Sequence, residues 1–275
     1  MVVFPNCKIN LGLNIILKRE DGYHDLETVF YPIAINDTVE IITNTDKILS
    51  EQIQYSTSGI SVTGDINSNL CVKAYYLLKS KFSQIPSIKM HLHKNIPIGA
   101  GLGGGSADGA FTLQLLNNKY QLGLSQLELI NYALELGSDC PFFMLNKACI
   151  GKGRGEILTE IALNLSNYQF LMVNPNIHIS TAWAFSKIIP AVPNSPIEKI
   201  IQEPVIKWKD HLINDFQKPV VDKHPEIGLI IDLLYSSGAI YASLSGSGST
   251  VFGIFKKATV VIPKFSKSYY IKLVN

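Results

Sequence analysis

The sequence lacks the features typical of oxidised, membrane-spanning or nucleic-acid-binding proteins. It has four cysteines, Cys7, Cys71, Cys140 and Cys149, and no Cys-x-x-Cys pair, which argues against structural zinc. No apolar run reaches ~18 residues without a charge or a turn signal, so we expect no membrane span. Charged residues make up 17% of the chain and the net charge is +2, which leaves no basic footprint for a nucleic acid. With no leader before the first strand-like run, we expect a globular cytoplasmic protein.

Two familiar nucleotide-binding signatures are incomplete. Gly99, Gly101 and Gly104 fit Gly-x-Gly-x-x-Gly, but a dinucleotide fold needs an acidic residue ~20 residues later, at a strand end. Residues 124–128 show no strand end. A P-loop needs Gly-Lys-Ser/Thr, whereas Gly105-Ser106 is not accompanied by a lysine. The match to a dinucleotide fold is therefore misleading, and a dehydrogenase would predict binding of NAD rather than ATP.

The sequence does contain a dense run of glycines between Pro97 and Ala110, which reads Pro-Ile-Gly-Ala-Gly-Leu-Gly-Gly-Gly-Ser-Ala-Asp-Gly-Ala. A strand pattern over residues 88–93 precedes it, and a helical pattern over residues 106–120 follows. The loop therefore leads into a helix N-terminus, where free N–H groups and the helix dipole favour an anion. We expect this anion to be phosphate, the alternative being a glycine-rich turn without a ligand.

The first strand pattern, residues 2–17, carries a polar stripe. Aliphatic side chains alternate there with Lys8, Asn10 and Asn14, so the three polar side chains share one strand face. That face lies in solvent or lines a cleft.

A hairpin turn is expected at Asp21-Gly22, and Tyr23 and His24 follow it directly. An aromatic ring and an imidazole at a hairpin end either pack an edge of the sheet or form a pocket for a flat ring. Both interpretations are open at this point.

Periodicity and turn signals predict the remaining elements. Strands are expected over residues 27–42 with a break at Asn36-Asp37, and over 48–62 with a turn at Ser58-Gly59, 148–161 as a hairpin, 170–173 and 240–255. Helices are expected over residues 70–82, 125–136, 210–216 and 226–234, with a short one after Ser180-Thr181. The prolines between Ile189 and Trp208 predict an irregular surface loop. A length of 275 residues suggests one large or two modest domains.

Two further stretches have a structural and a functional interpretation. Asp139 lies between Gly137, an expected helix C-cap, and an apolar run. It is either a turn or cap residue, or a carboxylate held in a dry cleft near a cation such as Lys8. Residues 243–250, rich in serine and glycine, form either a plain hairpin turn or a further phosphate or substrate site.

The motifs occur together in a known family. Residues 97–110 resemble the central motif of the GHMP small-molecule kinases, which cradle ATP phosphates without a P-loop. The other motifs resemble, in order, the members of that superfamily that act on a cytidyl methylerythritol substrate. They are Lys8-Ile9-Asn10-Leu11, residues 21–30 with Asp-Gly-Tyr-His at their start, Gly137-Ser138-Asp139-Cys140-Pro141-Phe142 and Leu244-Ser245-Gly246-Ser247-Gly248. The likeness runs nearly end to end and is weakest over residues 189–204 and the C-terminal tail.

The resemblance implies an α/β (α+β) fold with two lobes. Residues 1–160 would form an N-terminal ATP-binding lobe of the ribosomal S5 domain 2-like type, and residues 161–275 a C-terminal α/β lobe that contributes to the substrate site. The implied reaction transfers the γ-phosphoryl group of ATP, with Mg²⁺, to the 2-hydroxyl of the cytidyl methylerythritol substrate, in the non-mevalonate route to isoprenoid precursors. We expect a small-molecule partner with a cytidine diphosphate moiety, and a monomer or weak homodimer. A kinase of another substrate in the superfamily and a catalytically silent nucleotide-binding module are the alternatives.

The resemblance also implies roles for individual residues. Asp139 would be the base or orienting carboxylate for the hydroxyl, and Lys8 would hold Asp139 and stabilise charge on the transferring group. The residues implied to bind ATP are Asn69, Leu70, Lys94, Pro97, Gly99, Gly101, Leu102, Gly103, Gly104, Gly105 and Ser106, of which Ser106 could also contact Mg²⁺. Those implied to bind the cytidyl substrate are Asn10, Tyr23, His24, Phe30, Thr181 and Phe185. Tyr23 and Phe185 would stack on the cytosine.

Overall fold

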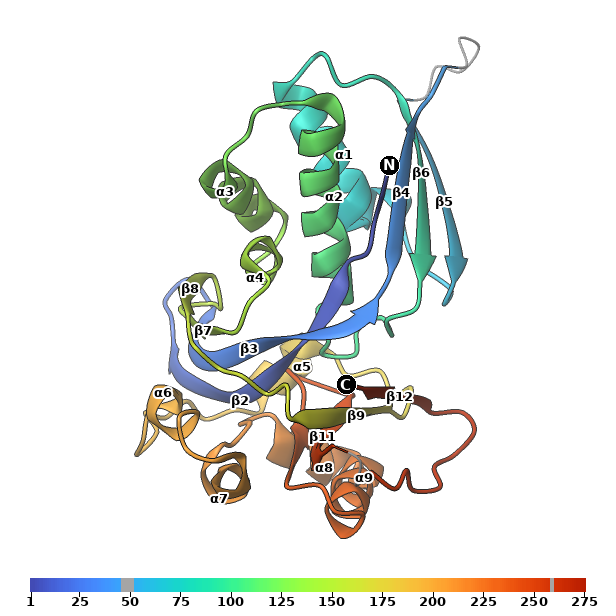
Figure 1. Ribbon diagram of the computed structural model, residues 1–275. Coiled ribbons are helices and arrows are strands. Elements are labelled where there is room, and N and C mark those ends of the chain that lie inside the picture. Colours follow the sequence, from blue (N-terminus) through green and yellow to red (C-terminus); the bar gives the residue numbers. More distant parts are fainter. Residues whose placement is uncertain (46–51, 258–259) are drawn as a thin grey trace. The chain divides into compact units, whose positions relative to one another are not determined.

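The computed structural model describes residues 1–45, 52–257 and 260–275, in a mixed α/β fold (Figure 1). The residues group into two compact units. Unit 1 comprises residues 1–7, 35–98 and 103–146, and unit 2 comprises residues 8–34, 99–102 and 147–275. The glycine loop therefore starts and ends in unit 1, while its four middle residues belong to unit 2. The division into an ATP-binding lobe up to residue 160 and a substrate-binding lobe beyond it stays a prediction.

Unit 1 contains a four-stranded sheet in the order β1-β4-β6-β5. Its strands are β1 (Val2–Val3), β4 (Thr38–Thr43), β5 (Ile53–Gly59) and β6 (Ile88–Lys94). β5 runs parallel to β6, and the other pairs are antiparallel. In β6, Ile88, Met90 and Leu92 are buried, as alternation predicts, and Lys94 continues the buried series at the strand end. The expected strand over residues 48–62 corresponds to β5, while residues 48–51 lie outside the described residues.

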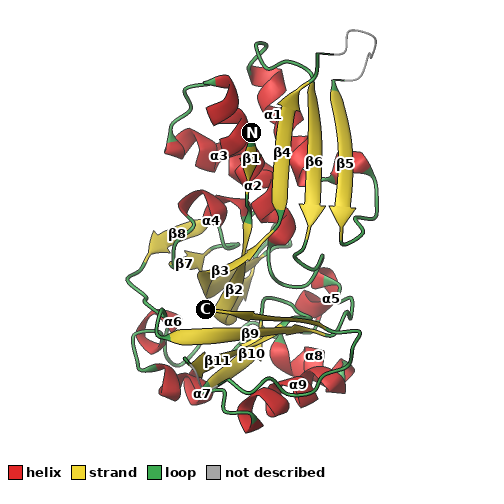
Figure 2. Cartoon of the chain, turned by 45° about the vertical axis from the view of Figure 1, so that its right-hand side comes forward, coloured by secondary structure: helices red, strands yellow, loops and turns green. Residues whose placement is uncertain are grey.

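Helices α1 (Leu70–Lys81) and α2 (Gly104–Tyr120) pack against each other on one face of this sheet (Figure 2). A short 3₁₀ turn, η1 (Ile66–Ser68), leads into α1. α3 (Gln126–Leu136) begins with a capping box between Ser125 and Glu128. It ends at Gly137, the C-cap that the sequence predicts. The short α4 (Cys140–Leu145) follows Asp139.

Unit 2 contains two further four-stranded sheets. In two of their strands, β2 and β3, the residues at one end (6–7 and 35–36) are grouped with unit 1. One has the order β2-β3-β7-β8, with β2 (Asn6–Lys18), β3 (His24–Asn36), β7 (Cys149–Lys152) and β8 (Ile157–Glu160). The other has the order β10-β11-β9-β12, with β9 (Tyr168–Asn174), β10 (Tyr241–Leu244), β11 (Val251–Lys256) and β12 (Tyr270–Val274). α9 (Pro225–Ser236) packs on β10 and β11, and α8 (Gln217–Lys223) packs on α9. A buried aliphatic and aromatic cluster holds these layers together.

The prediction of a helix over residues 210–216 was wrong. Only α7 (Trp208–His211) is helical there, because the chain after it pairs with β2. Leu13 N donates to Ile213 O at 2.9 Å, and Asp215 N donates to Leu13 O at 2.9 Å. The side chain of Asn214 donates to backbone carbonyls at the end of β10 and in the loop after it. Long-range pairing thus overrides the local helical pattern.

The prediction of an irregular surface loop over residues 189–208 was correct only for its first part. The second part forms α6 (Ile197–Ile200) and the 3₁₀ turn η2 (Val205–Lys207), and it buries Ile197, Val205 and Trp208. Its prolines lie at the N-caps of these elements, Pro196 before α6 and Pro204 before η2. The short helix after Ser180 is α5 (Thr181–Ser186), as predicted. Among the described residues, no helix is long and apolar enough to cross a membrane.

Candidate active site

The glycine loop has the backbone geometry expected of an anion-binding turn. Gly99, Gly101 and Gly103 have φ values of 64°, 78° and 68°, in the left-handed region that favours glycine. Gly103 is the N-cap of α2 and has no side chain that could occupy the N–H groups of the first turn. α2 is 17 residues long, and its dipole favours negative charge at Gly104. The loop therefore leaves backbone donors for an anionic ligand.

The serine- and glycine-rich loop over residues 245–250 packs against the middle of the glycine loop. Ser245 Oγ donates to Gly101 O at 2.8 Å, and Thr250 N donates to Ala100 O at 3.2 Å. A Cβ added to Gly101 would lie 1.9 Å from Ser245 O, so no larger residue fits there. This contact goes beyond the plain hairpin turn and shows that residues 245–250 support the glycine loop. Binding of phosphate or substrate by these residues stays a prediction.

Two of the residues implied to bind ATP lie at the start of α1. Asn69 caps this helix, since its Oδ1 accepts from Cys71 N at 2.9 Å, and its Nδ2 donates to Tyr55 Oη at 2.9 Å. Leu70 is the first residue of α1 and contacts Gly109 of α2, where an added Cβ would lie 2.8 Å from Leu70 Cβ. Both residues therefore have structural partners, and their contact with ATP stays a prediction.

The other ATP residues lie in or next to the glycine loop. Leu102 is buried, and its carbonyl accepts from Lys8 N at 3.0 Å. Lys94 is 3% exposed and pairs with the carboxylates of Asp37 and Asp108. Pro97, Gly105 and Ser106 complete the set, with Gly105 and Ser106 in the first turn of α2. The charge of Lys94 is thus already engaged within unit 1.

Lys8 belongs to the polar stripe of β2 and is held at the glycine loop. Its side chain is 4% exposed, and Nζ donates to Asn10 Oδ1 at 2.5 Å and to Gly101 O at 3.2 Å. Asn10 Nδ2 in turn donates to Thr28 Oγ1 at 2.9 Å, which fixes the amide orientation. The Lys8 ammonium also lies 5.3 Å from the centre of the Phe30 ring. The polar face of this strand is therefore buried rather than exposed to solvent.

Asp139 is half-buried in unit 1, between the C-cap of α3 and the start of α4. Its side chain does not cap α4, which removes one of the two structural interpretations. The next residue, Cys140, is fully buried and its thiol hydrogen-bonds Ser106 in the first turn of α2, and burial raises the pKa of this thiol to about 12. The protonated Cys140 thereby connects the Asp139 segment with the glycine loop.

Two of the residues implied to bind the cytidyl substrate are brought together in unit 2. The rings of His24 and Phe185 are stacked with centroids 4.8 Å apart and an interplanar angle of 22°. Phe185 also meets the ring of Phe216 edge-on, with centroids 4.9 Å apart. Partial burial lowers the pKa of His24, so its imidazole is neutral at pH 7. The stacked His24 and Phe185 rings are therefore an uncharged aromatic pair.

Tyr23 faces a different neighbour. Its ring is 54% exposed, and the guanidinium of Arg154 lies 4.9 Å from the ring centre. Arg154 is itself oriented by Glu156, which accepts from both its backbone N and its Nε. Sequence reasoning missed Arg154, although an arginine between Gly153 and Gly155 at an expected hairpin tip was a usable signal.

Thr181 is the first residue of α5, and its Oγ1 lies 3.3 Å from Ser247 Oγ, so this implied substrate residue contacts the serine- and glycine-rich loop. Sequence reasoning also missed Thr28, which links Asn10 to the carbonyl of Gly12 through a hydrogen bond of 2.6 Å. Alternation along β3 would place Thr28 on the same face as Phe30.

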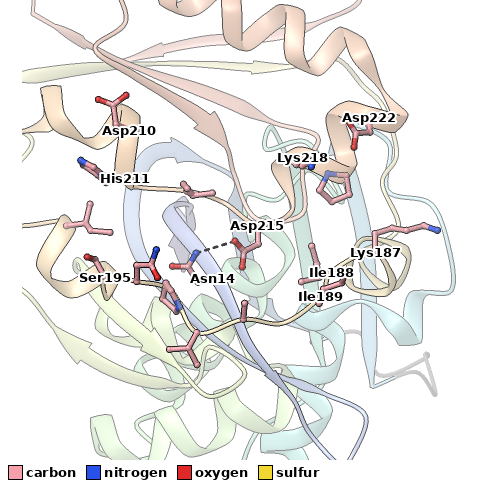
Figure 3. Close-up of a pocket in the computed structure, with 17 residues that line it drawn as sticks. Asn14, Lys187, Ile188, Ile189, Ser195, Asp210, His211, Asp215, Lys218 and Asp222 are labelled. Atoms are coloured by element: carbon pink, nitrogen blue, oxygen red, sulfur yellow. Dashed lines mark hydrogen bonds between the residues drawn. The ribbon is translucent and has the colours of Figure 1, made fainter.

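A separate pocket of about 690 Å³ opens in unit 2 (Figure 3). Asp215 points into it and is held by two donors, Asn14 Nδ2 at 3.3 Å and Ile15 N at 2.7 Å. Burial raises the pKa of Asp215 above its ordinary value. The third polar residue of the β2 stripe, Asn14, therefore serves this pocket and not the glycine loop.

Comparison with known proteins agrees with the geometry. The model of the GHMP kinases N terminal domain matches residues 69–147, and that of the GHMP kinases C terminal domain matches residues 199–271. A 4-diphosphocytidyl-2-C-methyl-D-erythritol kinase of Azobacteroides pseudotrichonymphae is 49% identical, over 98% of this chain and 99% of the relative. The enzyme of the same name from Bacteroides fragilis is also 49% identical, over 93% of this chain and 92% of the relative.

A crystal structure of 4-(cytidine 5′-diphospho)-2C-methyl-D-erythritol kinase has a similar fold. It superposes with a TM-score of 0.78 at 29% identity, covering 92% of this chain and 90% of that one. A homoserine kinase from Cytophaga hutchinsonii, with a TM-score of 0.73 at 11% identity over 100% of this chain and 93% of that one, shares the fold. Two matched domain models, near full-length relatives and the glycine loop between strand and helix lead to one conclusion: the chain belongs to the GHMP kinases and, within them, to the family of 4-diphosphocytidyl-2-C-methyl-D-erythritol kinases.

Proposed function

We propose that this protein transfers the γ-phosphoryl group of ATP to the 2-hydroxyl of 4-diphosphocytidyl-2-C-methyl-D-erythritol. The observation that carries the proposal is the buried Lys8 ammonium, which Asn10 and the Gly101 carbonyl hold at the glycine loop. Phosphoryl transfer requires chiefly positioning and stabilisation of charge on the transferring group. A fixed cation beside a glycine-rich turn supplies both.

The phosphates of ATP bind, in this proposal, at the glycine loop and the N-terminus of α2. Three observations support this assignment: the left-handed glycines, the N-cap without a side chain, and the close approach of Gly101 to Ser245. Backbone N–H groups in such a turn can bind phosphate without a P-loop lysine. We place the adenosine part near Asn69, Leu70 and Lys94, as the family resemblance implies.

Asp139 and Lys8 carry the chemistry in this proposal. Asp139 accepts or orients the proton of the attacking hydroxyl, while Lys8 stabilises negative charge as the phosphoryl group is transferred. Asp139 is half-buried next to the first turn of α4, and its side chain does not cap that helix.

Mg²⁺ is the metal that the family implies. Mg²⁺ prefers oxygen ligands and is held in many kinases by one or two protein groups together with the substrate phosphates. The hydroxyl of Ser106, in the first turn of α2, is an oxygen donor of this kind, so the donor chemistry fits. When bound, the ion would neutralise charge on the phosphates.

The cytidyl group binds, in this proposal, beside the stacked His24 and Phe185 rings. Asn10, Tyr23, Phe30 and Thr181 complete the residues assigned to the substrate, and Arg154 joins them through its contact with Tyr23. The stacked ring pair and the neutral imidazole support recognition of a flat, polar base.

A coupled assay for ADP tests the function. With ATP and Mg²⁺, we expect turnover with 4-diphosphocytidyl-2-C-methyl-D-erythritol and none with homoserine or mevalonate. Turnover with either of these and none with the cytidyl compound would instead establish a kinase of another substrate in the superfamily. A thermal shift with ATP and none with NAD would exclude the dehydrogenase alternative.

A further inference from the structure

Three charged side chains are buried together next to the glycine loop in unit 1. Asp37 is 0% exposed, and Lys94 and Asp108 are each 3% exposed. Asp37 lies between β3 and β4, Lys94 ends β6, and Asp108 is in the second turn of α2. Buried charges are costly unless they are paired, so this cluster requires an explanation.

The cluster holds the chain where it enters the loop. Lys94 Nζ donates to Asp37 Oδ2, and the other oxygen of Asp37 accepts from Asn95 N at 2.6 Å and from Ile96 N at 2.8 Å. The two residues between β6 and the glycine loop are thus bound through their backbone amides.

The same cluster holds the chain where it leaves the loop. Lys94 Nζ donates to Asp108 Oδ2 at 2.7 Å, which ties the end of β6 to α2. Gly104, the first residue of α2, packs on the same lysine, since an added Cβ would lie 3.1 Å from Lys94 Nζ and 2.9 Å from Ile96 Cγ2. Both ends of the loop therefore meet at one ammonium group.

We propose that Asp37, Lys94 and Asp108 form an ionic clamp that sets the separation of the two loop ends, and that Asp37 and Asp108 are positioning residues for ATP. This inference rests on the proposed binding of the ATP phosphates at the glycine loop. Neither carboxylate touches the reacting atoms, and each acts through Lys94 or through loop amides. The clamp fixes the ends of a glycine-rich segment whose own backbone would otherwise sample many conformations.

Stability alone does not account for Asp108. Its Oδ1 has no hydrogen-bond partner in the described part of the chain, and Asp37 would by itself neutralise Lys94. Removing one partner of a buried ion pair is strongly destabilising because it leaves a charge uncompensated, but loss of Asp108 would leave Lys94 paired with Asp37 and so avoids that penalty. An Asp108 that served only folding would therefore be dispensable, whereas a positioning residue would not.

The test compares Asp108→Leu with Asp108→Asn. Leucine removes the bond to Lys94, while the asparagine carbonyl can still accept it and should restore function. We expect Asp108→Leu to keep the melting temperature of the wild type and to raise the KM for ATP by roughly 10-fold, the equivalent of one hydrogen bond to a charged group. The KM for the cytidyl substrate should stay within about twofold, and Asp108→Asn should keep the wild-type KM for ATP.

Tyr75→Phe is the matched control. The Tyr75 hydroxyl donates to Gln52 O at 3.0 Å and to Pro86 O at 3.1 Å, so its removal deletes buried hydrogen bonds of unit 1 away from the loop. It should lower the melting temperature and leave both KM values unchanged. A comparable rise in the ATP KM of Tyr75→Phe would overturn the clamp, because general destabilisation would then explain the effect.

Three other results would contradict the proposal. They are a wild-type ATP KM in Asp108→Leu, an equal rise of both KM values, and an ATP KM in Asp108→Asn as high as in Asp108→Leu. If Asp108→Leu does not fold, Asp108→Ala replaces it in the comparison. Gly103→Val distinguishes failure of the clamp proposal from failure of the proposed phosphate site. If Gly103→Val weakens ATP binding and Asp108→Leu does not, the clamp proposal is wrong while the proposed role of the loop stands.

Discussion

Gly103→Val gives the sharpest test of the proposed phosphate site, because the structure offers a matched control in the same unit. Gly103 has φ 68° and Gly123, in the turn between α2 and α3, has φ 75°. A valine at either position meets the same left-handed backbone penalty, on the order of 1–2 kcal/mol. A Cβ at Gly123 has no heavy atom within 4 Å, so its cost is that penalty alone.

The two variants should therefore share this backbone penalty and differ in ligand binding. At Gly103, the N-cap of α2, the branched side chain would occupy the space assigned to a phosphate and displace the N–H groups of the first turn. Loss of one hydrogen bond to a charged group costs about 1.5–3 kcal/mol, which corresponds to a roughly 10-fold to 150-fold weaker affinity for ATP.

The assay is titration calorimetry with ATP together with the melting temperature of each variant. We expect Gly103→Val to weaken ATP binding and Gly123→Val to leave it unchanged, while the melting temperatures report the cost of the strained backbone in each variant. Wild-type affinity in a folded Gly103→Val would refute the assignment of the phosphates to this loop. So would an equal loss in Gly123→Val, since backbone strain alone would then explain both.

Three further predictions concern chemistry, substrate and stability. Asp139→Asn should keep ATP binding and lose roughly 10²-fold to 10⁴-fold in kcat, and combining it with Lys8→Ala should cost far less than the product of the two losses; near wild-type turnover in Asp139→Asn would exclude the role. Phe185→Ala should raise the KM for the cytidyl substrate by roughly 5-fold to 150-fold with the ATP KM unchanged, because it removes the ring that stacks on His24; an equal change in both KM values would indicate a packing role. The raised pKa of Asp215 means that the folded state binds its proton more tightly than the unfolded state, so its contribution to stability is present at low pH and is lost as the pH rises through the folded pKa. The unfolding free energy of the wild type relative to Asp215→Asn, from urea denaturation at a series of pH values, should therefore fall as the pH rises through the folded pKa, and a constant difference would contradict this.

The sequence by itself determined the local elements that carry the site. The glycine run between a strand and a helix, the Asn69 and Ser125 caps and the Asp21-Gly22 turn depend on residues adjacent in the chain, and the structure has each of them. The burial of the aliphatic face of β2 also followed from alternation. Alternation could not decide whether the polar face, which carries Lys8, is exposed to solvent or buried. Short-range physics was sufficient because neighbouring residues set φ, ψ and the first hydrogen bonds.

Only the tertiary structure decided which charges are paired and which strands meet. Residues 212–216 leave the helical pattern because they pair with β2, some 200 residues earlier in the chain. The stack of His24 on Phe185 and the contact of Arg154 with Tyr23 join segments that no spacing rule connects. Asp37, a turn residue by its sequence, becomes the acceptor for two loop amides because β4 and β6 pair in the sheet. Burial and long-range pairing are properties of the whole fold, and they decide which residues from distant parts of the sequence come into contact.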